Sequence, residues 1–313
     1  MDDARAPALP VETGTRWIAR RFAQHRLALA SAVIIICLAT LAISAPLIKA
    51  MLGVEADAVD LFNRYGPPST THPLGTDELG RDVLIRLLYG GQVSLFVGLT
   101  ATIAAALIGT CIGLLSGYIG GRTDAVIMRI TDGVIALPVL PLLIVLAAID
   151  LNKLGLPDGV IGSENASLYR IVAIVALVGW TTVARLVRAS TLALKARPFV
   201  EAARAQGAGP LRIMARHILP NLASPIIVAT TLAVGNVILL ESVLSFLGLG
   251  IQPPIPSWGN LLTGAQETIW QAPGLAFYPG MLIFVTVVAF NFVGDGLQDA
   301  LDPRALNRQS DGH

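Results

Sequence analysis

Six apolar stretches dominate the pattern of this chain, and polar segments of unequal length separate them. A transmembrane helix needs about 20 mainly apolar residues in a row, and each stretch reaches that length. The predicted spans are 27–48, 93–118, 125–149, 168–187, 225–247 and 276–297. The pattern therefore predicts an all-α membrane protein with six transmembrane helices.

Two of the predicted spans carry residues that constrain their shape and packing. Gly109, Gly113 and Gly117 recur every fourth residue of the second span, so they share one helix face. A neighbouring backbone can approach closely along such a face. In the third span, Pro138 and Pro141 predict a kink, which suits either a bending gate or a curved bundle.

The distribution of Lys and Arg predicts the orientation of the spans. Basic residues concentrate before the first span, in the connection 188–224 and after the last span, whereas 248–275 contains none. The segment 49–92 departs from this bias, but acidic residues accompany its basic ones. Because cytoplasmic loops carry the excess of Lys and Arg, both termini and the connection 188–224 are predicted to be cytoplasmic.

These boundaries divide the chain into a small number of parts. They are a cytoplasmic N-terminal segment (1–26), a first transmembrane helix (27–48), an external segment (49–92), a five-helix core (93–297) that includes the loop 188–224, and a cytoplasmic tail (298–313). The first apolar run is longer than the core of about 7–15 residues found in a secretory signal. The stretch before it interleaves apolar with basic residues: Trp17, Ile18 and Phe22 with Arg16, Arg20 and Arg21. It is either an interfacial helix or a plain positive-inside anchor.

Composition excludes several classes of protein. The chain is 54% hydrophobic and 14% charged, with a mean hydropathy of +0.69, whereas a soluble domain is about 45–50% apolar and about 25% charged. Its net charge of +1 gives no reason to expect nucleic acid as a partner. The sequence contains no phosphate-binding loop, no catalytic triad pattern and no metal-ligand spacing, so we expect no catalytic residue, no metal site and no cofactor bound by this chain.

The polar segment 198–220 is the most informative part of the chain. Pro198 suits the first position of a helix, and Gly207 suits the left-handed residue that ends it. Pro210 then begins a second short helix, which Pro220 is predicted to end. Two short helices meeting at a glycine form a compact protrusion suited to a groove on another protein, although an ordinary loop fits the spacing equally well.

Polar residues within or beside the spans leave two interpretations open. Asp132, Asn236 and Glu241 either line and gate a translocation path or tie helices together by hydrogen bonds, because carboxylates at bilayer depth must face protein or water. In the external segment, the pairs Asp77–Arg81 and Asp82–Arg86 are spaced for ion pairs on a short helix.

Several motifs resemble one transport family. Glu201-Ala-Ala-x-x-x-Gly207 followed by His217-Ile-Leu-Pro220 resembles the EAA loop of binding-protein-dependent ABC importers, with His217 where the pattern often has Ile. Further motifs resemble the C-type permease subunit of the dipeptide/oligopeptide (peptide/opine/nickel) branch: His72-Pro-Leu-Gly-Thr-Asp-Glu-Leu-Gly-Arg-Asp82, Leu244-Ser-Phe-Leu-Gly-Leu-Gly250, Ser257-Trp-Gly259 and Gly294-Asp-Gly-Leu-Gln-Asp-Ala-Leu-Asp-Pro-Arg304. The resemblance covers nearly the whole chain, from about Arg16 to Arg304.

The resemblance implies a type I ABC importer permease (MetI-like) architecture in a bacterial inner membrane. It implies a second, homologous permease subunit, two ATP-binding subunits that hold ATP and Mg, and an extracytoplasmic solute-binding protein. Di- and oligopeptides are the implied substrates, although relatives carry nickel, glutathione, opines, sugars or haem. An ion-coupled secondary transporter is the alternative, but such transporters contain inverted repeats and this sequence shows no convincing repeat.

The candidate residues follow from the resemblance and from the polar positions in the spans. Those expected to couple to the ATPase are Glu201, Ala202, Ala203, Arg204, Gly207, Arg212, Arg216 and Pro220. Those expected to line or gate the path are Asp132, Pro138, Asn236 and Glu241. Those expected to contact the binding protein are Trp258, Gly259, Asp77 and Arg81. For this external region, a lid packed on the bundle is the alternative.

Overall fold

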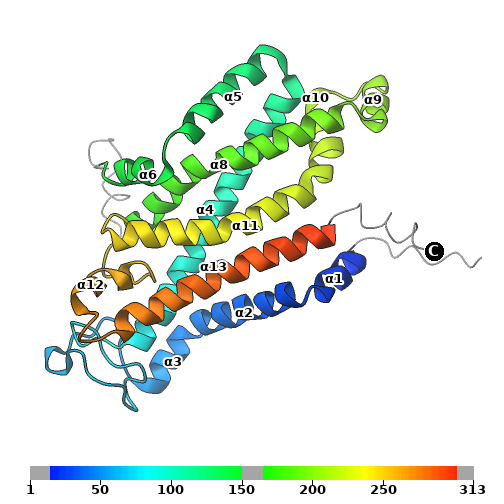
Figure 1. The fold of residues 1–313 in the computed structure, drawn as a ribbon. Helices are drawn as coiled ribbons and strands as arrows, with labels where there is room; N and C mark the ends of the chain where they lie inside the picture. Colours follow the sequence, from blue (N-terminus) through cyan, green and yellow to red (C-terminus); the bar gives the residue numbers. More distant parts are fainter. Residues whose placement is uncertain (1–14, 150–164, 302–313) are drawn as a thin grey trace, which may run out of the picture.

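The chain folds into a bundle of long helices, as a computed structural model of residues 15–149 and 165–301 shows (Figure 1). Among these residues, five helical stretches are long and apolar enough to cross a membrane: α2 (Arg26–Ile43), α4 (Val83–Ile119), α8 (Ala166–Lys195), the continuous stretch Pro210–Phe246 and α13 (Gly274–Leu301). A bent pair, α5 (Gly121–Ala136) and α6 (Val139–Ala147), gives a sixth span if it is counted as one. Most of the two predicted terminal segments lies outside the described residues.

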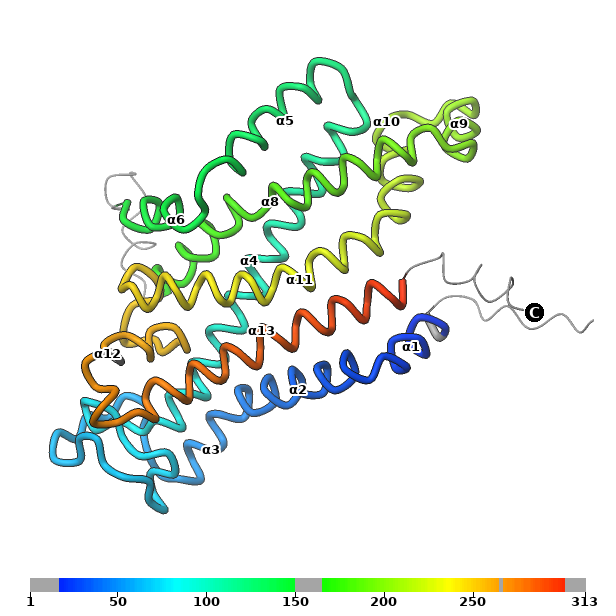
Figure 2. Tube along the Cα trace, viewed as in Figure 1, coloured from blue at the N-terminus to red at the C-terminus, as the bar shows by residue number. Residues whose placement is uncertain are grey.

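Shorter elements gather at the two ends of the bundle. They are α1 (Thr15–Gln24), α3 (Ala45–Leu52), η1 (Leu61–Asn63), α9 (Pro198–Ala205), α10 (Pro210–Ile213), η3 (Met214–Ile218), η4 (Asn260–Leu262) and α12 (Ala265–Thr268), with α11 (Leu219–Phe246) following η3. Figures 1 and 2 show α1, α9, α10 and the end of α13 at one end, here called the α9 end. The opposite end, here called the α12 end, holds α3, α12 and the segment 53–82.

The predicted first span is shorter than expected. The helix α2 ends at Ile43 and the separate helix α3 follows, with Pro46 in its first turn. Proline has no N–H to continue the helical ladder. The carbonyl of Ala42 instead accepts a hydrogen bond of 2.6 Å from the Nε2 of Gln92 on α4. A contact from a distant helix therefore stabilises the break.

The second predicted span begins earlier than expected, at Val83. Asp82 precedes this helix, and its Oδ1 accepts a hydrogen bond of 2.7 Å from the backbone N–H of Ile85. An aspartate in this position caps one of the free N–H groups at a helix start. The predicted short external helix is therefore absent, and its last residues form the first turns of α4.

The third predicted span is broken rather than kinked. The axes of α5 and α6 differ by 89°. Leu137 and Pro138 between them have extended backbones, with ψ angles of 137° and 120°. The conformation of Leu137 follows from the next residue, because proline disfavours the helical conformation of the residue before it. Pro141 causes no second break, since it lies in the first turn of α6, where an N–H has no helical partner.

The glycine face of α4 packs against α8, which confirms the predicted close approach. A Cβ atom added to Gly109 or Gly113 would lie 2.5 Å from a backbone oxygen of α8, and one added to Gly117 would lie 2.8 Å away. The three carbonyls belong to Trp180, Ala184 and Arg188. The two helix backbones are therefore in direct contact along three turns.

Candidate functional site

The predicted protrusion at the α9 end has the expected glycine corner. Gly207 has a φ of +82°. Its N–H donates to the carbonyl of Arg204 (3.0 Å), and the N–H of Ala208 donates to the carbonyl of Ala203 (3.1 Å). This pair of bonds is the Schellman arrangement, which fixes the direction of the chain after a helix. The corner between α9 and α10 is therefore ordered by its own backbone.

The prediction that Pro220 ends the second short helix is wrong. The chain remains helical from Pro210 to Phe246 and widens into a π-helical turn over Met214–Ile218. In this turn the N–H of Leu219 bonds the carbonyl of Met214, five residues earlier. A π turn shifts the hydrogen-bond register by one residue, so the proline that follows it is accommodated. The protrusion is thus continuous with a membrane-spanning helix.

The protrusion has a buried inner face and an exposed outer face. Val200 is fully buried and Ala203 is buried, and both lie on the side of α9 that meets the bundle. Val200 belongs to an apolar cluster with Ile213 and Met214. Seven of the eight expected coupling residues are exposed: Glu201, Ala202, Arg204, Gly207, Arg212, Arg216 and Pro220. Ala203 therefore packs inward, and of the alanine pair only Ala202 is exposed to a partner.

A central cavity of about 540 Å³ lies among the core helices. Helices α4, α5, α6, α8 and α11 line it, and most of its wall is apolar. The polar side chains on this wall are Asn236, Thr102, Thr181 and Thr182. Asn236 is the expected path residue that faces the cavity, and the threonines were not predicted because nothing in their sequence context distinguishes them.

The other expected path residues lie away from this cavity. Asp132 is exposed on α5 and forms an ion pair with Arg185 of α8. Pro138 is exposed and does not line the cavity, although the neighbouring Val139 does. Asp132 therefore attaches α5 to α8, and Pro138 contributes to the break between α5 and α6, the two helices that form one wall of the cavity.

Glu241 ties helices together in this structure and does not line the cavity. Its side chain is fully buried. Its Oε1 accepts a hydrogen bond of 2.7 Å from Ser245, and its Oε2 accepts one of 3.4 Å from Ser94 of α4. The structure thus favours the structural interpretation for this carboxylate. Ser245 lies one helical turn after Glu241 and is visible in the sequence as a partner, whereas Ser94 is 147 positions away and is not.

The structure buries Trp258 and Gly259, the two residues of this loop that are expected to contact a binding protein. Trp258 is 2% exposed, and its Nε1 donates a hydrogen bond of 2.9 Å to the carbonyl of Leu87. A Cβ atom on Gly259 would lie 2.6 Å from the Cα of Ser242. The loop that carries these residues is therefore packed onto α4 and α11, as a lid on the bundle.

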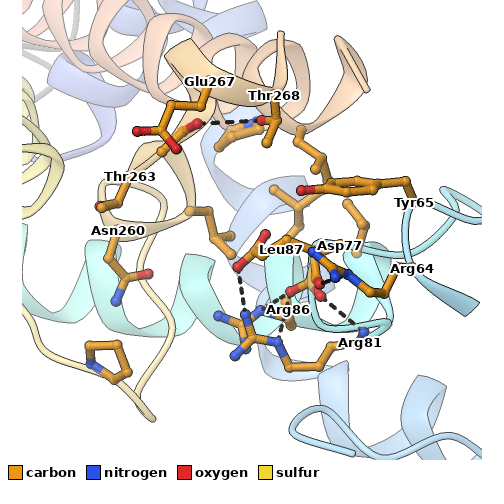
Figure 3. A pocket seen from close by; sticks show the side chains of 17 residues that line it. Arg64, Tyr65, Asp77, Arg81, Arg86, Leu87, Asn260, Thr263, Glu267 and Thr268 are labelled. Atoms are coloured by element: carbon orange, nitrogen blue, oxygen red, sulfur yellow. Dashed lines mark hydrogen bonds and ion pairs between the residues drawn. The ribbon is translucent and has the colours of Figure 1, made fainter. Parts of the chain in front are cut away.

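Asp77 and Arg81 lie in a pocket of about 390 Å³ at the α12 end (Figure 3). They form the predicted ion pair of 2.8 Å, but on a turn: the Oδ1 of Asp77 accepts bonds from the backbone N–H groups of Leu79 and Arg81. The predicted Asp82–Arg86 pair is wrong. Asp82 bonds the Nδ1 of His72 at 3.0 Å, because its role as a helix cap turns its carboxylate away from Arg86.

Comparison with known proteins places these features in context. A family model described as "Binding-protein-dependent transport system inner membrane component" matches residues 109–307, and one described as "N-terminal TM domain of oligopeptide transport permease C" matches residues 15–68. A glutathione transport system permease protein of Pectobacterium atrosepticum is 39% identical over 94% of this chain and 92% of its own length. An oligopeptide transport system permease protein of Bacillus subtilis is 37% identical over 91% of this chain and 88% of its own length. A dipeptide transport system permease protein of Alkalihalophilus pseudofirmus is 39% identical over the same shares.

Proposed function

Because this chain belongs to the family of binding-protein-dependent transport system inner membrane components, we propose that it forms half of the path through which an ATP-driven importer moves peptides. The chain is a permease subunit and not an enzyme, and family membership removes the ion-coupled alternative. Di- and oligopeptides are the substrate class that the names of the similar permeases support. Glutathione, itself a small peptide, belongs to the same chemical class.

The complete importer on this proposal contains several other chains. A second, homologous permease subunit completes the path, two ATP-binding subunits hold ATP and Mg, and a solute-binding protein delivers the peptide. The lining of the central cavity supports the peptide as substrate. Its apolar lining with one amide and three hydroxyl side chains offers hydrogen bonds to peptide groups of many sequences without selecting one charge.

The α9 end is the cytoplasmic end on this proposal. The described helix α1, the end of α13 and the protrusion all lie at that end (Figure 1). The basic residues of α1 and of the connection between α8 and α11 also concentrate there, in keeping with the positive-inside bias. The α12 end then faces the solute-binding protein.

Transport on this proposal is mechanical. The ATP-binding subunits grip the exposed outer face of α9 and displace it as they close. To change a two-state path from 1:99 to 99:1, about 5.5 kcal/mol of differential binding is needed. A protrusion with an ordered corner and a buried inner face transmits that work into α11, because helix continues from Pro210 to Phe246.

The observation that carries this proposal is the ordered two-helix protrusion on a chain of this family. The test is reconstitution of the complex in liposomes and measurement of ATP-dependent uptake of a labelled dipeptide. We expect uptake to require ATP hydrolysis and to survive collapse of ion gradients. Uptake that persists without any ATP-binding subunit would contradict the proposal.

A further inference from the structure

The pocket at the α12 end contains a buried cation whose hydrogen-bonding groups are incompletely used. The side chain of Arg86 is 7% exposed. Among the described residues, its Nε and Nη1 form no hydrogen bond. Buried guanidinium nitrogens without hydrogen bonds are costly. Figure 3 shows Arg86 on one wall of this pocket, with Asn260, Thr263 and Glu267 on the opposite wall.

Two carboxylates approach Arg86 without satisfying it. Asp77 and Asp57 each lie 3.5 Å from one of its nitrogens. Asp77 is already held by Arg81 and by two backbone N–H groups. Asp57 is 58% exposed, so its side chain is free to leave. If Asp57 leaves, the Nη1 of Arg86 becomes open to a carboxylate of another protein that approaches more closely.

The pocket is separate from the transport path. None of the residues that line it also lines the central cavity. It lies at the end of the bundle opposite to the protrusion, between the segment that precedes α4 and the segment that precedes α13 (Figures 1 and 3). Arg86 is therefore outside the central cavity, at the end of the bundle that a docked protein would cover.

The segments that form the pocket also expose large aromatic side chains. Phe62, two residues before the pocket residue Arg64, is fully exposed, and Trp270, two residues after Thr268, is 93% exposed. Aromatic residues and arginine are enriched among the residues that dominate the energy of protein–protein interfaces. This combination favours a protein partner over a small anion.

We propose that Arg86 receives a carboxylate side chain, Asp or Glu, from the docked solute-binding protein, and that this carboxylate displaces Asp57. The inference rests on the proposed function, since it assigns the chemistry of one contact to a partner which that function requires. The planar guanidinium binds a carboxylate through two parallel hydrogen bonds. Arg86 thus fixes where the binding protein sits on this subunit.

Two substitutions with opposite expected effects test the proposal. In nanodiscs that contain the complete importer, the affinity for the purified solute-binding protein is measured by titration of its stimulation of ATP hydrolysis. Arg86→Gln should weaken this affinity about tenfold, equivalent to about 1.4 kcal/mol. Asp57→Asn should strengthen it several-fold, because it removes the internal competitor. Arg64→Gln is the matched control: Arg64 lines the same pocket but is exposed, and its Nε already donates to the carbonyl of Glu78 at 2.7 Å.

A double-mutant cycle identifies the partner group. Surface Asp and Glu residues of the solute-binding protein are changed one by one to the amide, and one of them should lose its effect once Arg86→Gln is present. Unchanged affinity in Arg86→Gln, or weaker affinity in Asp57→Asn, would overturn the proposal. So would a loss in Arg86→Gln that depends on anionic lipid and not on a carboxylate of the binding protein. Failure of the proposed function is distinguishable, because the wild-type complex would then show no stimulated ATP hydrolysis at all.

Discussion

The backbone N–H of Trp258 donates a hydrogen bond of 3.1 Å to the Oγ of Ser94, and the same hydroxyl donates to the buried carboxylate of Glu241 at 3.4 Å. One serine of α4 thus joins the loop at the α12 end to a buried polar cluster on α11, which is formed by Glu241, Ser242 and Ser245. In the sequence, Ser94 is 147 positions from Glu241 and 164 positions from Trp258. These hydrogen bonds fix the loop to the bundle. Substitutions of the residues that form them should therefore lower the stability of the fold, and any loss of transport should follow from that.

Replacement of Glu241 should reveal a structural carboxylate. Glu241→Ala removes the acceptor of the Ser245 hydrogen bond and leaves a cavity, so we expect a loss of about 2–4 kcal/mol in stability. Glu241→Gln keeps the volume and one acceptor oxygen, and it should be milder. Thermal unfolding midpoints of the purified subunit in detergent measure both. Normal midpoints combined with lost uptake would show that this residue acts in the path instead.

The glycine face of α4 gives a second prediction. Gly113→Ala would place a methyl group 2.5 Å from the carbonyl oxygen of Ala184, so the two helices must separate. Overpacking of this kind costs about 1–3 kcal/mol. The matched control is Gly133→Ala on α5, where nothing lies within 4 Å of the added atom. Thermal unfolding should detect a loss only for the first variant, and equal midpoints would contradict the observed packing.

The corner of the protrusion gives a third prediction, which concerns coupling. Gly207→Val places a β-branched residue at a φ of +82°, which costs about 1–2 kcal/mol and disturbs the exit from α9. We expect the variant to insert into the membrane normally but to lose transport and retention of the ATP-binding subunits. Gly207→Asn tolerates this conformation better and should keep most activity. Co-purification and ATP-dependent uptake measure the difference, and normal uptake by the valine variant would count against the coupling role.

A fourth prediction concerns the central cavity. Asn236→Leu replaces the amide on the cavity wall with an apolar group of similar size. Loss of a polar contact to the substrate should reduce dipeptide uptake several-fold, while assembly and basal ATP hydrolysis stay unchanged. Uptake by vesicles, normalised to the amount of assembled complex, measures the effect. An unaltered uptake rate would place the path elsewhere.

Local sequence patterns determined much of this protein. The spans followed from runs of apolar residues, the close approach of α4 from glycines at every fourth position, and the corner of the protrusion from a glycine that follows a short helix. Each of these features depends on residues that are near one another in the chain. The backbone conformation of such segments is dominated by propensity, capping and periodicity, and all three can be read before the fold is known.

Tertiary structure alone decided the rest. Glu241 is in the middle of an apolar stretch whether it faces a path or a neighbour, and only the approach of Ser94 on α4 makes it a tie between helices, alongside Ser245 of its own helix. Trp258 lies in a loop, yet it is buried because α4 offers the carbonyl of Leu87. Arg86 is spaced for a pair with Asp82, but the fold gives Asp82 to His72 and leaves the guanidinium in a pocket. These outcomes depend on which surfaces meet across long chain distances, and a one-dimensional pattern does not specify those encounters.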